Sequence, residues 1–392
     1  MDINNAKISL IHDWFIRESL GGAEEVTFLL DKLISENYSE PDLFALTENI
    51  SEEQFEIFSE RKINTSLIQI LPFGKEKVQR YLPLIPFAIE QLDLREYDLI
   101  ISSSHIAAKG VLTSPDQLHI SYIHTPMRYA WDQMNTYIER SSLKNSVLEI
   151  PLRYLLYKLR SWDFISGHRP DYLIANSQFT SKRIKKYWRL DSKVIHPPVN
   201  IKRFSYNSER EDFYLSVNRL VPNKRVDLII KAFNTLKLPL VIVGDGPEKN
   251  KLKKIANSNI IFYGKGTNYN VEKLLSKCRA FVYAGIEDFG IAPVEAMASG
   301  APVIGLGKGG LLDTVNCYTQ PKKNKISTGI LFKKQSSSDI IDTINWFEDK
   351  QIWKFFKPQD LNQHAQKFNP EDFKNKFQYF LETSWDSFCK KN

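Results

Sequence analysis

Two glutamates eight residues apart are the first candidates for chemistry. They are Glu287 and Glu295, in the segment EDFGIAPVEAMASG. Pro293 suits the first helical position and Gly300 the position just past a helix end, so we expect a short helix over about 293–299. The N-terminus of a helix favours an anion such as phosphate, whereas carboxylates suit the hydroxyls of a sugar or a ribose. The alternative is structural: Glu295 caps the helix at N3 and Glu287 is solvated.

Basic residues and glycines follow other apolar runs. Arg219 and Lys224 lie in NRLVPNKRVD, directly after FYLSV. An arginine fork and a lysine charge there can neutralise a diphosphate, although a solvated basic loop is the alternative. Gly309 and Gly310 in GKGGL, and Gly22 after the first predicted strand, allow backbone N–H groups to approach phosphate. Taken together, these strand-end features predict a nucleotide diphosphate held in a cleft between two domains.

An alternation of apolar runs and helical patterns must position these residues. Val26, Leu29, Leu30, Leu33 and Ile34, for example, share one face of a predicted helix. Strands that alternate with helices predict an α/β fold with parallel sheets. The runs typical of buried parallel strands are residues 7–11, 97–102, 119–123, 172–176, 213–217, 238–243, 260–263, 280–283 and 302–304.

The pattern restarts once, which predicts two Rossmann-like domains. The connector at 194–199 contains two adjacent prolines and is expected to be rigid. We predict an N-terminal domain at residues 1–195 and a C-terminal domain at 196–367. An aromatic helix over about 368–392 is expected to cross back onto the first domain.

Composition excludes several classes of protein. The 392 residues are 42% hydrophobic and 25% charged, which is typical of globular proteins and excludes wholesale disorder. No apolar stretch reaches the roughly 20 residues of a spanning helix, and the N-terminus lacks the basic region of a signal peptide. Three cysteines without a CxxC pair favour a reducing compartment, so we expect a cytoplasmic protein. The net charge of +7 favours an anionic partner: nucleic acid, a phosphorylated small molecule or an acidic membrane.

Three histidines follow predicted strands and therefore lie where ligands of parallel sheets bind. His124 precedes Thr125 and Pro126, while His12 and His105 follow two other strands. Each could contact a ligand. For His12 and His105, a structural hydrogen-bonding role is an equally good interpretation.

Three segments, residues 75–89, 152–162 and 181–193, combine basic and aromatic side chains. Basic amphipathic helices with aromatic residues can lie on an anionic membrane, and an exposed apolar patch at 75–89 could receive a polyprenyl tail. The alternative is a set of core-facing helices with solvated basic faces. No nucleic-acid-binding motif is present, so nucleic acid is not expected as a partner.

A longer series of motifs resembles a known family. The order HDW…GGAEEV, YIHTPMRYAWD, ANSQFTSKRI, VIHPPVN, NRLVPNKRVD, VGDGPE and EDFGIAPVEAMASGAPVI covers nearly the whole chain. It resembles the family 4 retaining glycosyltransferases of the GT-B fold, and EDFGIAPVE fits their E-x7-E motif. HTPMRYAWD looks most like bacterial mannosyltransferases that build O-antigen or exopolysaccharide on a lipid carrier.

The resemblance implies that residues 1–195 bind the acceptor and residues 196–367 the nucleotide-sugar donor. It also implies a role for each matching residue. In one respect the chain departs from the family, because Asp313 stands where a glutamate is common, and the role of that position stays open. The implied contacts are Glu287 with the donor sugar, Glu295 with the ribose, Arg219 and Lys224 with the diphosphate, the backbone of Phe289, Gly290 and Ile291 with sugar and phosphate, Gly22, Gly309 and Gly310 with the donor, His124 with the transferring sugar, and His12, His105 and Arg128 with the acceptor.

The activity that the resemblance implies is transfer of mannose from GDP-mannose to a lipid-linked saccharide in cell-surface polysaccharide synthesis. A UDP-sugar donor, glucose or N-acetylglucosamine, is the alternative, and a catalytically silent sugar-nucleotide-binding scaffold is the second. We expect no metal or other cofactor, because the chain has no D-x-D run and Arg219 and Lys224 can carry the leaving-group charge. The expected location is the inner face of the cytoplasmic membrane, with peripheral attachment.

Overall fold

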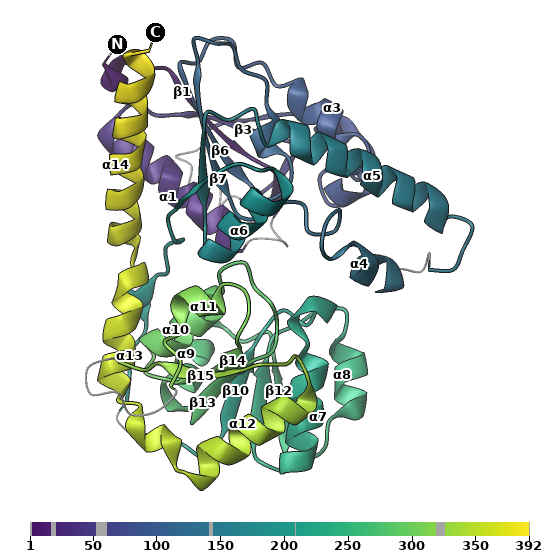
Figure 1. Ribbon diagram of the computed structural model, residues 1–392, viewed down its shortest axis with the longest axis vertical. Helices are drawn as coiled ribbons and strands as arrows, with labels where there is room; N and C mark the ends of the chain where they lie inside the picture. Colours follow the sequence, from purple (N-terminus) through teal and green to yellow (C-terminus); the bar gives the residue numbers. More distant parts are fainter. Residues whose placement is uncertain are drawn as a thin grey trace. The chain divides into compact units, whose positions relative to one another are not determined.

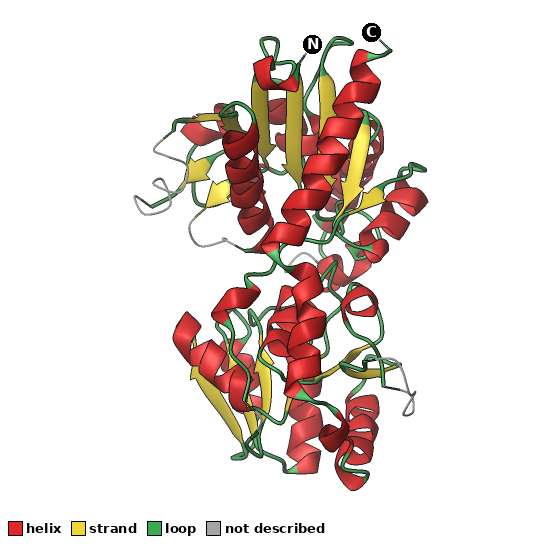
Figure 2. Ribbon diagram, turned by 90° about the vertical axis from the view of Figure 1, so that its left-hand side faces the viewer, coloured by secondary structure: helices red, strands yellow, loops and turns green. Residues whose placement is uncertain are grey.

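Two compact units make up the chain. The computed structural model describes residues 2–16, 21–51, 61–140, 144–207, 209–318 and 326–391. Unit 1 comprises Met1–Pro197 together with Phe373–Asn392, and unit 2 comprises Pro198–Asp372. Each unit has its own parallel sheet with helices packed against it (Figures 1 and 2).

The unit 1 sheet has the strand order β5-β3-β1-β6-β7-β8-β9 among the described residues, and all its pairings are parallel. The order reverses between β1 and β6, which pair from Ile8 opposite Leu99 to His12 opposite Ser103. β1, β6 and β7 are buried along their whole length, as expected for a parallel sheet covered on both faces. The strands are β1 (Ile8–His12), β3 (Asp42–Ala45), β5 (Ile63–Thr65), β6 (Leu99–Ser104), β7 (Leu118–Ile123), β8 (Tyr172–Ala175) and β9 (Lys193–Val194), with a separate pair β2 (Phe15–Ile16) and β4 (Glu48–Asn49).

Helices of unit 1 bury apolar side chains against this sheet. The C-terminal helix lies beside the first helix (Figure 1), and the hydroxyl of Tyr38 donates to Glu382 at 2.9 Å. Phe373, Phe377 and Leu381 join one core with the strands and the first helix. The helices are α1 (Gly22–Asn37), α3 (Ile85–Glu90), α4 (Met134–Arg140), α5 (Glu149–Ser166), α6 (Gln178–Tyr187) and α14 (Pro370–Cys389), with 3₁₀ turns η1 (Ile3–Asn5), η3 (Leu67–Ile70), η4 (Val78–Tyr81) and η5 (Ala108–Gly110).

Unit 2 has the strand order β12-β11-β10-β13-β14-β15 among the described residues, again all parallel. This is the doubly wound order of a Rossmann fold, and it reverses between β10 and β13. The strands are β10 (Tyr214–Val217), β11 (Leu240–Val243), β12 (Ile260–Gly264), β13 (Ala280–Tyr283), β14 (Val303–Leu306) and β15 (Gly329–Phe332). The helices are α7 (Val226–Leu236), α8 (Lys249–Ile255), α9 (Asn268–Lys277), α10 (Ile291–Ala298), α11 (Leu311–Thr314), α12 (Ser337–Asp349) and α13 (Pro358–Ala365), with 3₁₀ turns η6 (Ile201–Arg203), η7 (Pro222–Lys224), η8 (Ile352–Phe355) and η9 (Gln366–Phe368).

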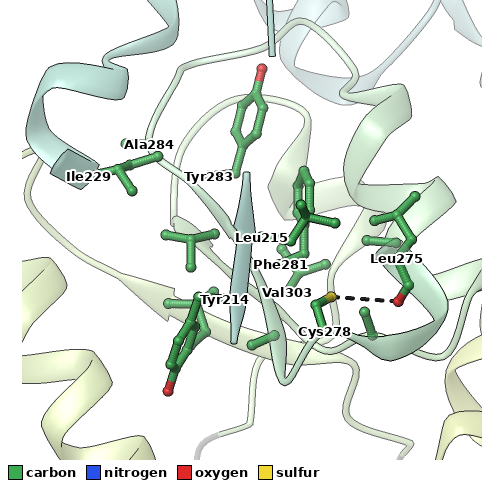
Figure 3. Packing of buried hydrophobic residues seen from close by; sticks show 14 of the residues in the cluster. Tyr214, Leu215, Ile229, Leu275, Cys278, Phe281, Tyr283, Ala284 and Val303 are labelled. Atoms are coloured by element: carbon green, nitrogen blue, oxygen red, sulfur yellow. Dashed lines mark hydrogen bonds between the residues drawn. The ribbon is translucent and has the colours of Figure 1, made fainter. Parts of the chain in front are cut away.

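The core of unit 2 surrounds its two central strands. Leu215, Ile229 and Phe281 are fully buried there. Figure 3 shows Tyr283 at the border of this cluster, with its hydroxyl pointing away from the packed side chains. The core therefore fixes the ring of Tyr283 while its oxygen stays available for polar contacts.

The predicted fold class, two Rossmann-like α/β halves with parallel sheets, is confirmed. Prediction missed six strands of only two to four residues each, namely β2, β3, β4, β5, β9 and β15. Such short segments lack the apolar run that marks a central strand. No described helix is both long and apolar enough to cross a bilayer.

Candidate active site

The first candidate site lies at the carboxyl edge of the unit 2 sheet. Ligands of open α/β sheets bind there, at the point where the strand order reverses. In unit 2 this point is between β10 and β13, and the chain leaving these strands carries Lys224 and Glu287. The topology thus brings together two loops that are far apart in the sequence.

Lys224 and Glu287 form an ion pair at this edge. Nζ of Lys224 lies 2.6 Å from Oε1 of Glu287 and 3.2 Å from the hydroxyl of Tyr283. The Tyr283 hydroxyl donates to the same Oε1 at 2.5 Å. The side chains of Lys224 and Glu287 are 21% and 15% exposed, so both are mostly buried and remain accessible to a ligand.

Backbone geometry lets the two loops approach each other. Arg225 ends η7 in the left-handed region at φ 52° and starts α7. Gly285 lies against the other loop: a Cβ at this position would be 3.2 Å from Cα of Lys224 and 3.3 Å from the Asn223 carbonyl oxygen. A side chain at residue 285 would therefore push Lys224 away from Glu287.

The helix after Glu287 begins earlier than predicted. α10 starts at Ile291 rather than at Pro293, after Gly290 with φ 95°. Pro293 is the third helical residue, which is tolerated because N–H groups in the first turn have no intrahelical acceptor. Glu295 is then the fifth residue and lies beyond the first turn, so the structural alternative, in which Glu295 caps the helix at N3, is wrong.

Gly309 and Gly310 pack against the loop that carries Glu287. Gly309 has φ 73°, and a Cβ there would lie 2.4 Å from the Glu287 carbonyl oxygen. The N–H of Gly310 donates to that same carbonyl at 2.8 Å. This N–H already has an acceptor, so the evident task of the glycine pair is to hold residues 287–289 in place.

Three further residues that the resemblance singles out belong to the same unit. The Arg219 side chain is exposed after β10 and makes no hydrogen bond or ion pair with any described residue. The Phe289 side chain is buried against Phe368, with ring centroids 5.5 Å apart, so only its backbone faces the edge. Asp313 lies in α11.

Unit 1 gathers a second set of candidate residues at the equivalent edge of its own sheet. β1, β6 and β7 end beside one another, and His12, His105 and His124 stand at these ends. The ring centroid of His12 lies 5.6 Å from that of His105 and 6.4 Å from that of His124. The three predicted histidines are thus brought together.

Asp13 organises the loop after β6. It is fully buried, and its carboxylate accepts four consecutive backbone N–H groups, those of residues 105–108, at 2.5–3.0 Å. Nδ1 of His105 lies 2.7 Å from Oδ2 of Asp13. Burial alone would raise the pKa of Asp13, but His105 and the backbone donors hold that pKa well below its usual range. Burial would lower the pKa of His105, and the Asp13 charge raises it above its ordinary value.

The other two histidines are held by hydroxyls and backbone. His12 Nδ1 contacts the Ser103 carbonyl oxygen at 2.8 Å and the Thr27 hydroxyl at 3.2 Å. The Ser103 hydroxyl contacts His124 Nε2 at 2.8 Å. Burial, followed by the charges of His12 and His105, lowers the pKa of His124 to about 3, so its imidazole is neutral at physiological pH.

Gly22 and Arg128 border the same edge of unit 1. Gly22 is the first residue of α1, after Gly21, whose N–H donates to the Glu24 carboxylate at 2.8 Å. Arg128 is half-buried in the turns after β7, and its charge acts on His105.

Prediction missed two residues that complete these clusters, Tyr283 and Asp13. Tyr283 ends its strand four residues before Glu287, and Asp13 directly follows His12. A polar residue at a strand end was the available signal in both cases.

Comparison with known proteins assigns the chain to a family. The model described as Glycosyltransferase Family 4 matches residues 20–203, and the model described as Glycosyl transferases group 1 matches residues 199–368. The chain belongs to the family 4 glycosyltransferases. The two matches meet near the junction of units 1 and 2, so each unit corresponds to one of the two family models.

Curated relatives of this glycosyltransferase include mannosyltransferases. The alpha-1,3/1,6-mannosyltransferase ALG2 of Saccharomyces cerevisiae is 27% identical over 308 residues, covering 64% of this chain and 59% of that protein. The Kluyveromyces lactis ALG2 is 25% identical, covering 84% and 75%. The O-antigen chain mannosyltransferase RfbU of Salmonella typhimurium is 28% identical, covering 36% and 43%. The chain thus spans only part of the length of these relatives.

Solved structures confirm the GT-B fold of this glycosyltransferase. Anabaena HepE in complex with UDP and glucose superposes with a TM-score of 0.65 at 17% identity, covering 96% of this chain and all of that one. The sucrose-phosphate synthase of Thermosynechococcus elongatus superposes with a TM-score of 0.70 at 16% identity, covering 98% of this chain and all of that one.

Proposed function

We propose that this glycosyltransferase transfers mannose from GDP-mannose, with retention, to a lipid-linked saccharide in cell-surface polysaccharide synthesis. The mannosyltransferase names of the ALG2 and RfbU relatives support the sugar. Retention rests on the family resemblance of the sequence motifs.

The observation that carries this proposal is the Lys224–Tyr283–Glu287 cluster at the switch point of the unit 2 sheet. Because Lys224 and Tyr283 both contact Oε1 of Glu287, the carboxylate is held in one orientation. A fixed carboxylate suits the hydroxyls of a donor sugar, and the neighbouring cation suits the diphosphate.

The proposed reaction uses these charges at the transition state. The bond between the anomeric carbon and the diphosphate oxygen breaks, and the acceptor oxygen bonds to that carbon on the same face. The acceptor proton passes to the leaving phosphate. Negative charge grows on the diphosphate while the sugar becomes oxocarbenium-like, so prepositioned Lys224 and Arg219 lower the barrier. We propose that these two cations make a metal ion unnecessary.

The other residue assignments also remain proposals. In unit 2 we assign the ribose to Glu295 and the sugar and phosphate to the backbone of residues 289–291, with Gly309 and Gly310 supporting that loop. In unit 1 we assign Gly22 to the diphosphate, His124 to the transferring sugar, and His12, His105 and Arg128 to the acceptor. A neutral His124 is suited to hydrogen bonding with a hydroxyl rather than to charge stabilisation.

Two other functions are the rivals of this proposal. A UDP-sugar donor is the first, because HepE, which shares the fold, was crystallised with UDP and glucose. A silent nucleotide-sugar-binding scaffold is the second, although a scaffold has no need of the Lys224–Glu287 pair.

A lipid-linked acceptor would place the enzyme at a membrane. We therefore propose peripheral attachment at the inner face of the cytoplasmic membrane. No described helix could cross the bilayer, so such attachment would use a surface of the folded protein.

Calorimetric titration of the purified protein without added metal tests the donor. We expect GDP-mannose and GDP to bind and UDP, UDP-glucose and UDP-N-acetylglucosamine not to bind. Selective binding of a UDP-sugar would overturn the mannosyl assignment and keep the reaction class. Failure of all five ligands to bind a folded sample would refute the proposal.

Variants of the cluster test its catalytic role. Lys224→Ala and Glu287→Gln should each lower transfer by about 100-fold or more, by analogy with loss of one prepositioned charge-stabilising group. Lys231→Ala on the exposed face of α7 is the matched control and should keep normal turnover. Near-normal transfer by Lys224→Ala would contradict the assignment.

A further inference from the structure

Exposed apolar side chains are concentrated in two short parts of unit 1. Of the 23 large hydrophobic side chains that are exposed among the described residues, eleven lie within residues 70–87 and 147–165. These two ranges contain less than a tenth of the chain. On the surface of a soluble protein, exposed apolar side chains are normally scattered singly, so their clustering here is unusual. The eleven are Ile70, Phe73, Leu84, Phe87, Val147, Leu148, Ile150, Tyr154, Tyr157, Phe164 and Ile165.

Helix α5 is apolar on two opposite faces. Its inner face buries Leu156 and Leu159 in the core. Its outer face carries Ile150, Tyr154 and Tyr157, which are 75%, 59% and 52% exposed and recur at helical spacing. A surface helix that only covers a core has a polar outer face. The outer face of α5 is therefore built to contact something apolar.

The segment before α3 carries further exposed apolar side chains. α3 packs beside α5 (Figure 1), and the indole N–H of Trp162 on α5 donates to Glu90 at the end of α3 at 2.9 Å. Ile70, the last residue of η3, and Phe73, which follows it, are 86% and 61% exposed. We call residues 70–87 and 147–165 together the apolar-basic surface.

Three cations on this surface contact aromatic rings, whereas Arg153 pairs with Glu149 at 2.8 Å. Lys77 and Arg80 lie 5.9 and 5.7 Å from the ring centroid of Phe73, and Lys158 lies 5.4 Å from that of Tyr154. None of the three forms an ion pair with any described residue. Their charge is thus available to an outside anion, while the rings beside them offer apolar contact.

The third basic-aromatic segment, residues 181–193, has no exposed large apolar side chain among those of the described residues. Arg183 is buried and pairs with Asp132 at 2.6 Å. Trp188 is fully buried, and its indole N–H donates to Asp163 at 2.8 Å. The structure uses these side chains internally, which separates this segment from the other two.

We propose that the apolar-basic surface docks unit 1 on a bilayer that contains anionic lipid. Aromatic and aliphatic side chains would enter the boundary between headgroups and acyl chains, while Lys77, Arg80 and Lys158 face lipid phosphates. An apolar surface with three cations that pair with no described carboxylate matches an anionic bilayer better than an acidic protein, because a protein partner would pair these cations with carboxylates at fixed positions. The biological purpose of docking, access to a lipid-linked acceptor, rests on the proposed function.

Vesicle co-sedimentation of the full chain tests the proposal. The probes are vesicles of phosphatidylcholine alone and vesicles with about 30% phosphatidylglycerol, at low salt and in 0.5 M salt. We expect binding to the anionic vesicles only, weakened by salt. The double variant Lys77→Glu/Arg80→Glu should lose about tenfold or more in partitioning, since each basic residue near an anionic surface contributes appreciably.

Matched variants of exposed aromatic residues distinguish a specific docking surface from non-specific adsorption to vesicles. Phe73→Asp and Tyr157→Asp should each reduce vesicle binding several-fold. Tyr379→Asp on α14, where the tyrosine is 71% exposed, should leave binding unchanged. All three positions are exposed, so loss of folding is not expected, and circular dichroism checks this.

Several results would contradict docking on an anionic bilayer. Equal binding to both kinds of vesicle, no binding to either, or an equal loss in Tyr379→Asp would overturn the proposal. A stable dimer in solution that Phe73→Asp dissociates would instead show that the surface binds a second copy of the chain. Donor titration of the same variants should match the parent protein. Vesicle binding without donor binding would keep the surface and refute the proposed function.

Discussion

Replacing Asp13 with asparagine is the sharpest test of how unit 1 holds its candidate residues. The Asp13 carboxylate accepts the N–H groups of residues 105–108 and pairs with Nδ1 of His105. Asparagine keeps one acceptor oxygen and turns the other position into an NH₂ donor. At least two buried N–H groups then lose their acceptor, and His105 loses its counter-charge.

The size of the effect follows from these contacts. A buried donor left without an acceptor costs about 1–3 kcal/mol, and breaking one side of a buried ion pair costs about 3–5 kcal/mol. Since these terms describe overlapping losses, we expect Asp13→Asn to lower the free energy of unfolding of unit 1 by about 3–5 kcal/mol. That is a large part of the roughly 5–15 kcal/mol typical of folded proteins.

Urea unfolding followed by tryptophan fluorescence measures this loss. Five of the seven tryptophans belong to unit 1 (Trp14, Trp131, Trp162, Trp188 and Trp385), so the signal reports mainly on that unit. His105→Gln keeps the four backbone hydrogen bonds of Asp13 and removes only the ion pair, so it should cost less. A loss below about 1 kcal/mol in Asp13→Asn, or an equal loss in His105→Gln, would refute the reasoning.

Three further predictions concern both units. Tyr283→Phe removes one contact to Glu287 and leaves the ion pair, so transfer should fall about tenfold with donor affinity little changed; unchanged turnover would argue against a role for the hydroxyl. Gly309→Ala should strongly reduce donor binding in calorimetry, because its Cβ would collide with the Glu287 carbonyl oxygen at a positive φ; normal affinity would contradict this. Burial of His119, with a smaller effect of Arg169, lowers its pKa to about 3, as for His124. In the unfolded chain each of these two imidazoles takes up a proton below about pH 6.5, whereas in the folded chain both stay neutral at pH 5. The free energy of unfolding should therefore fall between pH 8 and pH 5 by about 2 kcal/mol per histidine. His119→Gln should flatten that slope in urea titrations at the two pH values.

Much of this protein could be predicted from the sequence alone. The α/β class follows from apolar runs that alternate with helical patterns, because a strand covered on both faces must be apolar throughout. Lys224 and Glu287 could be placed at one sheet edge, because the carboxyl ends of parallel strands share an edge. The motifs around them also carried the family resemblance, which the two family models confirm.

Only the tertiary structure decided which side chains meet. The Tyr283 contact with Lys224 depends on the neighbouring positions of β10 and β13, which no local pattern encodes. α10 begins at Ile291 because Gly290 can adopt a positive φ. Pro293 alone predicted a helix that starts two residues later.

The same limit applies to the basic-aromatic segments. Residues 75–89, 152–162 and 181–193 look alike in sequence, yet Trp188 is buried and Tyr157 is exposed. Burial depends on which elements pack against a helix, and packing partners come from distant parts of the chain. Composition along one segment therefore predicts an amphipathic helix, and only the packed fold determines which of its residues face water.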